Sequence, residues 1–169
     1  MLAKFRRFLK RKGSPTDSPA ECMVKFHQAQ EELADHFLNL AAATGKPRGL
    51  KWKKLDFVDC WKLIRDIPGP QSPTSIQQQS HASDKQNTAE LLTLIHLVNL
   101  HFEAIEGSDM EDVAAVSTIR DGCAIFHYHD GHWGTGGRVL LNLAVDQALL
   151  AAFSDSEVIA ESEHQPESR

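Results

Sequence analysis

The fold of this chain is decided by residues 18–45, which read SPAECMVKFHQAQEELADHFLNLAAATG. Ser18 is a favoured N-cap, Pro19 takes the preferred first-turn position, and Glu21 completes a capping box. Because Gly45 and Pro47 stop a helix, the pattern predicts one helix over residues 19–43. The apolar stripe of this helix must be buried against another element. It comprises Met23, Phe26, Leu33, Phe37, Leu40 and Ala41.

Extended chain follows the helix. Residues 50–66, LKWKKLDFVDCWKLIRD, are rich in residue types that favour strands, and we expect two short strands joined near residues 56–59. Residues 67–88 are dominated by Pro, Ser and Gln, which predicts a disordered insertion between two sheet strands. The alternative interpretation of the insertion is a partner-binding segment.

The central strand of the sheet is predicted in residues 91–106, LLTLIHLVNLHFEAIE. Leu94, Val98 and Leu100 alternate on one face, whereas Asn99 and His101 share the other. Since neighbouring side chains of a strand point to opposite faces, this strand is apolar on one side and polar on the other over its second half.

A hairpin is predicted in residues 122–143, where Asp130-Gly131 is a favoured two-residue turn. This turn would place His129 opposite His132. The glycines at 134, 136 and 137 suggest a bulge before the strand continues. Residues 113–120 are expected to form a short helix or another extended piece, and residues 144–153 a short closing helix.

These elements predict an α+β fold: a long N-terminal helix packed on a curved antiparallel sheet of about four to five strands, with a short C-terminal helix. Cystatin-like and NTF2-like shapes are examples of this architecture. Residues 18–153 would form the single domain. Residues 1–17 would be a basic tail and linker, and residues 154–169 an acidic disordered tail.

Composition excludes several classes of protein. The 169 residues suit one domain, and no apolar run reaches the ~18 residues of a membrane-spanning helix. The net charge of −5 argues against a nucleic-acid partner. Cys22, Cys60 and Cys123 lie far apart, which suits a reducing compartment and predicts a cytoplasmic protein.

The first twelve residues, MLAKFRRFLKRK, differ from the rest of the chain in charge. Apolar residues recur at roughly helical spacing among the basic ones. One interpretation is a basic amphipathic segment that docks on an anionic membrane surface, which would make the protein peripheral at the membrane. The other is a solvated tail. The basic residues are Lys4, Arg6, Arg7, Lys10, Arg11 and Lys12.

A metal site is one chemical hypothesis for the hairpin. His127 and His129 would point to one face of a strand, and the turn would bring His132 alongside. Three imidazoles with an open position suit zinc or another transition metal. The plain alternative is a solvated turn that holds no cofactor.

A ligand pocket is the second chemical hypothesis. It would lie on the polar face of the sheet and comprise Asn99, His101, Glu103, Arg138 and Asn142. His101 and Glu103 would act as a base and its orienting carboxylate. The alternative is an outer face with cross-strand pairs such as Glu103 with Arg138. The acidic loop 106–112 lacks the spacing of an EF-hand, so a solvated loop is expected there.

Three runs, GKPRGLKW (45–52), FEAIEG (102–107) with MEDV (110–113), and HWGTGGRVLLNL (132–143), give the chain a resemblance to a family of uncharacterised bacterial proteins. The resemblance implies a bacterial, non-secreted single domain. That family has no assigned activity, so no catalytic residue is carried over.

We therefore expect a small non-enzymatic domain that binds an unknown protein or a small ligand. The alternative from another class is a metal-dependent or acid–base enzyme. It would use the hairpin histidines His127, His129 and His132 and the sheet pocket at His101 and Glu103.

Replacing residues 67–88 by a short Gly/Ser loop is expected to leave the thermal midpoint of unfolding nearly unchanged. The composition of the segment cannot bury enough apolar surface to offset the entropy of ordering it. Halving a loop changes its closure entropy by only about 0.6 kcal/mol. Thermal denaturation followed by circular dichroism is the measurement, and loss of the fold would show that the segment is structural.

Overall fold

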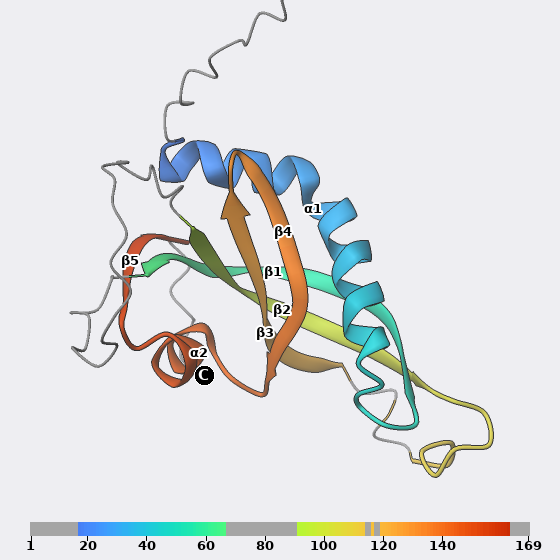
Figure 1. Ribbon diagram of the computed structural model, residues 1–169. Coiled ribbons are helices and arrows are strands. Elements are labelled where there is room, and N and C mark those ends of the chain that lie inside the picture. The colour runs from blue at the N-terminus through green and yellow to red at the C-terminus, as the bar shows by residue number, and fades with distance from the viewer. Residues whose placement is uncertain (1–16, 67–90, 114–115, 117–118, 163–169) are drawn as a thin grey trace, which may run out of the picture.

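The computed structural model describes residues 17–66, 91–113, 116 and 119–162. Five antiparallel strands form one sheet in the order β4-β3-β2-β1-β5, with a helix on each side (Figure 1). The α+β layout with a long N-terminal helix and a short C-terminal helix is therefore confirmed. The elements are α1 (Pro19–Ala43), β1 (Leu50–Asp66), β2 (Leu92–Ala104), β3 (Arg120–His129), β4 (His132–Leu141), α2 (Val145–Ala152) and β5 (Ser156–Glu161).

The helix α1 begins and ends as its sequence predicts. The Ser18 backbone N–H donates to Glu21 Oε2 at 2.7 Å, and the Glu21 N–H donates to Ser18 Oγ at 3.3 Å, which is the reciprocal capping box. The chain leaves the helix through Gly45, whose φ of 66° is left-handed. Leu40 is only partly buried, whereas Cys22 is fully buried.

The interface between α1 and the sheet is filled by an aromatic cluster. The Phe26 ring lies 5.6 Å from Phe57, 5.5 Å from His96, and 5.2 Å from both Phe126 and Trp133. These four rings come from β1, β2, β3 and β4 respectively. One helix side chain thus contacts four strands, and aromatic side chains occupy the space between the two layers.

The second helix, α2, packs on the opposite face of the sheet. Val145 and Ala148 form a smaller core with Ile64, Ile95 and Ile125. Residues 94 and 95 of β2 point to opposite faces, so Leu94 belongs to the α1 core while Ile95 belongs to the α2 core. The predicted closing helix over 144–153 is confirmed.

The segment Leu50–Asp66 is a single strand of 17 residues. The expectation of two short strands joined near residues 56–59 is wrong. The register with β2 shifts between Trp52 and Lys54 and again between Phe57 and Trp61, and pairing resumes after each shift. A bulge absorbs the extra residues here without a turn, because β2 supplies a continuous ladder on one side.

The ends of β1 and β2 lie side by side, since Arg65 pairs with Leu92 in the antiparallel register. The insertion predicted over residues 67–88 lies outside the described residues, as do the basic segment 1–12 and residues 163–169. Residues 113–120 are described only in part.

The β3–β4 hairpin is confirmed with its predicted register. Asp130 and Gly131 have φ values of 50° and 84°, and His129 pairs with His132 across the turn. The register of β3 with β4 shifts between Ala124 and Phe126. The extra residues lie in β4 between Thr135 and Val139, so the bulge falls in the glycine-rich run as predicted.

The acidic C-terminal stretch is a correction to the expected disordered tail. Residues Ser156–Glu161 form β5, an edge strand paired with β1. Lys62 Nζ lies 2.8 Å from both Asp146 Oδ1 and Glu161 Oε2, and Ile159 packs against the main core. Glu161 of this stretch is paired with a lysine on the neighbouring strand, which the amino-acid composition alone does not reveal.

The strand β4 approaches α1 closely at Gly137. A Cβ atom added there would lie 2.7 Å from the Leu40 Cβ and 2.8 Å from the Ala41 backbone nitrogen. The φ of Gly137 is also left-handed, at 69°. Contact with the helix and backbone conformation both require glycine at this position.

Replacing Gly137 by alanine is expected to lower the free energy of unfolding by about 2 kcal/mol or more, because steric crowding and left-handed φ each cost about 1 kcal/mol or more. Gly136→Ala is the matched control, since no atom lies within 4 Å of its added Cβ. Urea denaturation measures both variants. Equal stabilities would contradict the close approach of β4 to α1.

Candidate functional site

The polar half of β2 lies on the face of the sheet that α1 does not cover. Asn99 is in register with Asp56 of β1 on one side and with Asp121 of β3 on the other. His101 Nε2 lies 2.9 Å from Asp56 Oδ2, and Lys54 Nζ lies 2.6 Å from Asp56 Oδ1. Lys54, and then His101, hold the pKa of Asp56 below its usual value.

The predicted pocket is brought together only in part. The Asn142 N–H donates to the Asp121 carbonyl at 2.9 Å, so Asn142 lies next to the row that contains Asn99. Arg138 is elsewhere, with its guanidinium 5.5 Å from the centre of the Phe153 ring. Its neighbour Val139 is in register with Ala124, which pairs with His96. The position of His96 is about 23 Å along β2 from Glu103.

The cross-strand pair of Glu103 with Arg138, which the alternative interpretation offered as an example, is therefore wrong. Glu103 Oε2 instead lies 2.9 Å from Lys53 Nζ, and this lysine lowers the pKa of the carboxyl. The base-and-carboxylate pair expected from His101 and Glu103 is also replaced, because His101 contacts Asp56. The physical reason is sheet order: β3 lies between β2 and β4, so β1 supplies the partners of these β2 side chains.

The hairpin histidines are spread along the hairpin. His129 lies opposite His132 at the tip, and its Nδ1 is 3.4 Å from Asp130 Oδ2. His127 Nδ1 is 3.1 Å from Thr93 Oγ1, and burial lowers the pKa of this imidazole. Among the described residues, no group of three or more His, Cys, Asp or Glu side chains is gathered closely enough to hold a metal ion. A zinc site, and an enzyme built on it, stay predictions.

The sequence analysis did not identify His96, which is a buried histidine. Its side chain is only 2% exposed, stacks on Phe26, and meets Phe57 edge-on at 4.9 Å. Nδ1 lies 3.0 Å from the Leu97 carbonyl oxygen. Burial lowers the pKa of His96 to about 4, so it is a neutral core residue. The strand alternation that places Leu94 in the core places His96 there too, which was the available signal.

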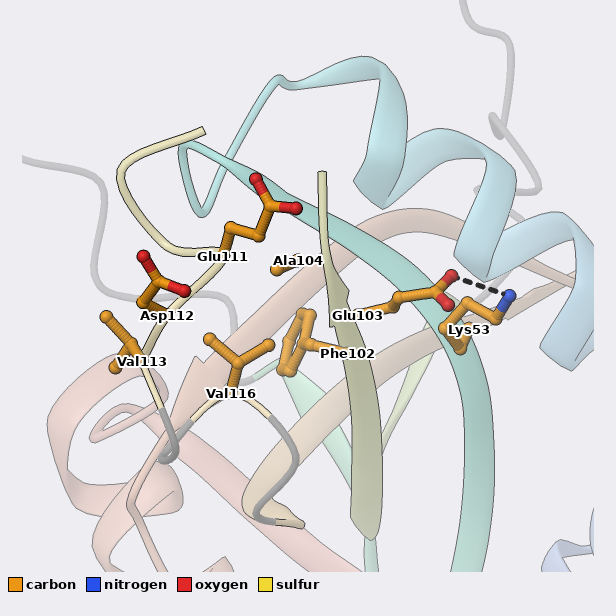
Figure 2. Close-up of a pocket in the computed structure, with 8 residues that line it drawn as sticks. All are labelled: Lys53, Phe102, Glu103, Ala104, Glu111, Asp112, Val113 and Val116. Atoms are coloured by element: carbon orange, nitrogen blue, oxygen red, sulfur yellow. Dashed lines mark ion pairs between the residues drawn. The ribbon is translucent and has the colours of Figure 1, made fainter. Parts of the chain in front are cut away.

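A surface groove of about 550 Å³ lies where β2 ends, and we call it the β2-end groove. Figure 2 shows the Val116 side chain beside the Phe102 ring, with Glu111 and Asp112 on the adjoining loop. The Lys53–Glu103 ion pair points away from them, across β2. The residues that line the β2-end groove are Lys53, Phe102, Glu103, Ala104, Glu111, Asp112, Val113 and Val116.

The groove exists because β2 is longer than the part of β3 that pairs with it. The β2–β3 ladder runs from Leu92 with Tyr128 to Leu100 with Arg120. Within the part of the chain that the structure describes, residues 101–104 therefore have no strand partner on the β3 side. The other side is paired, because Lys54 to Leu50 of β1 lie opposite His101 to Ala104.

The backbone of this unpaired stretch faces the groove. The Ile105 N–H donates to the Gly49 carbonyl at 2.9 Å, so the backbone groups of Ile105 point toward β1. Backbone groups alternate in direction along a strand, which points the N–H and C=O of Phe102 and Ala104 away from β1. Among the described residues, these main-chain groups have no strand partner, and they border a groove with the apolar Phe102 and Val116 in its lining.

The loop that forms the acidic wall is anchored to the start of β1. Ser108 Oγ donates to the Gly49 carbonyl at 3.1 Å, and a Cβ on Gly49 would lie 3.0 Å from the Met110 Cγ. Glu111 Oε2 accepts the Gly107 N–H at 2.8 Å. The sequence predicted a solvated loop here. It could not predict the groove beside the loop, because the relative lengths of β2 and β3 leave no local signal in the sequence.

A second groove, of about 580 Å³, separates α1 from the β3–β4 hairpin and brings His36 and His132 to one surface. Two of its polar side chains have partners. Trp133 Nε1 donates to the Cys22 carbonyl at 2.7 Å, and Lys25 Nζ lies 2.7 Å from Asp17 Oδ2. The Trp133 bond, together with a bond of 3.0 Å from Lys25 Nζ to the Tyr128 hydroxyl, ties the start of α1 to the hairpin.

Comparison with protein-family models, with curated proteins and with solved structures found no match. The resemblance to an uncharacterised bacterial family stays a prediction. No helix among the described residues is long and apolar enough to cross a membrane.

The stability of the fold is expected to fall on acidification through His96. Its pKa is 6.5 in an ordinary environment and about 4 in the fold, so between these values the unfolded chain binds more protons and stability decreases as pH falls. The loss by pH 4 is about 3 kcal/mol. Two neighbouring groups also act on the pKa of His96: His27 opposes its protonation, and Asp59 favours it.

His96→Phe, which keeps an aromatic ring and removes the titration, is the variant that tests this. Urea denaturation at pH 7 and at pH 4.5 should show a smaller loss in the variant than in the parent chain. Equal losses would mean that other groups cause the acid sensitivity.

Proposed function

We propose that this protein is a non-enzymatic peptide-binding domain, in which the β2-end groove receives an extended segment of a partner that carries basic residues. One observation supports the proposal above all others. The residues 101–104 of β2 lack a β3 partner among the described residues and border a groove with an apolar floor.

The main-chain contribution follows from the geometry of sheets. An extended peptide laid beside Phe102 and Ala104 would accept and donate hydrogen bonds as a short added strand. The register with β1 holds the two residues in strand conformation before a partner arrives. A prearranged edge lowers the entropy that binding must overcome.

The side chains of the groove would select the sequence of the peptide. Val113 is 39% exposed beside the buried Phe102 and Val116, so a partner's apolar side chain gains contact there. Glu111 and Asp112 make this wall of the groove acidic, whereas Lys53 is neutralised by Glu103. Basic side chains on the opposite face of an apolar–basic alternating peptide would meet these carboxylates.

We place this binding domain in the bacterial cytoplasm. Cys22, Cys60 and Cys123 are free thiols, and burial raises the pKa of each of them. A reducing compartment suits such unreactive thiols. The bacterial source rests on the resemblance alone.

Fluorescence anisotropy with two labelled ten-residue peptides tests the proposal. A peptide of alternating valine and lysine is expected to bind at least tenfold more tightly than one of alternating valine and glutamate. Replacing Asp112 by lysine should weaken the valine–lysine peptide at least fivefold, because a favourable charge becomes a repulsive one. Methylating alternate backbone nitrogens of the peptide should also weaken binding, since it removes main-chain donors.

Asp35→Lys is the matched control, because it makes the same change of charge at an exposed position of α1 that does not line the groove. It should leave the affinity within twofold. Failure of the valine–lysine peptide to bind at millimolar concentration, or equal effects of the two charge reversals, would overturn the proposal.

A further inference from the structure

We infer that the segment received by the β2-end groove is the basic N-terminal stretch, residues 1–12, of a second copy of this chain; the inference rests on the proposed function.

Charge complementarity is the first argument. Residues 1–12 carry six Lys and Arg residues and no Asp or Glu. The loop that borders the groove has the opposite character, with four acidic side chains and no basic one between residues 106 and 112. These side chains are Glu106, Asp109, Glu111 and Asp112.

The pattern of residues 3–6, AKFR, is the second argument. In an extended conformation Ala3 and Phe5 share one face, and Lys4 and Arg6 share the other. This alternating stretch has the same length as the unpaired residues 101–104 of β2. It therefore offers the groove an aromatic side chain for its floor and basic ones for its acidic wall.

Distance favours a second copy over the same chain. Asp17 bonds Tyr128, whose register partner on β2 is Leu92, ten residues before Phe102. The path along β2 is therefore about 33 Å. Eleven Cα–Cα steps join residue 6 to Asp17, and they span at most about 40 Å when fully extended. The segment would reach its own groove only in a nearly extended form, whereas a neighbouring copy imposes no such limit.

Two copies that exchange segments with each other would form a closed dimer. Each interface then combines main-chain pairing with attraction between opposite charges. The electrostatic part is screened over about 10 Å at 0.1 M salt, so the dimer should weaken as salt is raised.

Sedimentation equilibrium over a range of concentrations tests the inference. The full chain is expected to dimerise reversibly at low salt, and the chain without residues 1–12 to remain a monomer. The double variant Asp109→Lys with Asp112→Lys should weaken dimerisation at least tenfold. Neither aspartate bonds another described residue, so folding should be retained and circular dichroism would verify it.

The matched control is Glu31→Lys with Asp35→Lys, which reverses two exposed charges on α1. This control should dimerise like the parent. A monomeric parent at all concentrations, or a dimer that persists without residues 1–12, would overturn the inference.

Charge exchange gives a sharper result. A chain with Lys4→Glu and Arg6→Glu should be monomeric alone, as should the Asp109→Lys, Asp112→Lys chain. Mixing the two should yield a heterodimer, because the unchanged segment of one chain meets the unchanged groove of the other, and the two sets of reversed charges also attract each other. A mixture that remains monomeric would contradict pairing between these charges.

A synthetic peptide of residues 1–12 separates this inference from the proposed function. The peptide should bind the chain that lacks residues 1–12, and compete with the valine–lysine peptide. If the valine–lysine peptide binds and the 1–12 peptide does not, the occupant is wrong and the groove function stands. If the 1–12 peptide binds only phosphatidylserine-containing vesicles, its partner is a membrane and the inference is overturned.

Discussion

The structure depends on one contact set, that of the Phe26 ring with β1, β2, β3 and β4 through Phe57, His96, Phe126 and Trp133. A single helix residue thereby sets the position of α1 over four strands. Filling the helix–sheet interface with aromatic rings also has a functional consequence. In the part of the chain that the structure describes, the two grooves lie at the edges of this interface and not within it.

Local signals predicted the elements that depend on local chemistry. The capping box at Ser18 and the left-handed pair Asp130-Gly131 each act within four residues, so the sequence pattern and the structure agree on α1 and on the β3–β4 hairpin. Elements that depend on distant partners were predicted poorly. The strand β5 exists because β1 pairs with it and Lys62 contacts Glu161, and composition carries neither fact.

The candidate site shows the same division. Alternation along β2 correctly placed Asn99 and His101 on the polar face, because a period of two is a property of the strand itself. Arg138 was misplaced, because its position depends on sheet order and on the bulge in β4. The β2-end groove was invisible for a related reason. It arises from the difference in length between two paired strands, and that difference is set by long-range register.

Net charge conceals how the charges are divided along this chain. Residues 1–12 contain six of the 18 Lys and Arg residues and none of the 23 Asp and Glu residues, so the remainder has 12 basic residues against all 23 acidic ones. Such an imbalance attracts the basic segment to the acidic surface in general, but screening prevents long-range attraction from choosing one location. Selection must then come from short-range features: the main-chain groups of Phe102 and Ala104, and the apolar floor beside Val113. A solvated acidic surface offers charge alone, whereas this groove adds direction through hydrogen bonds and shape through its floor.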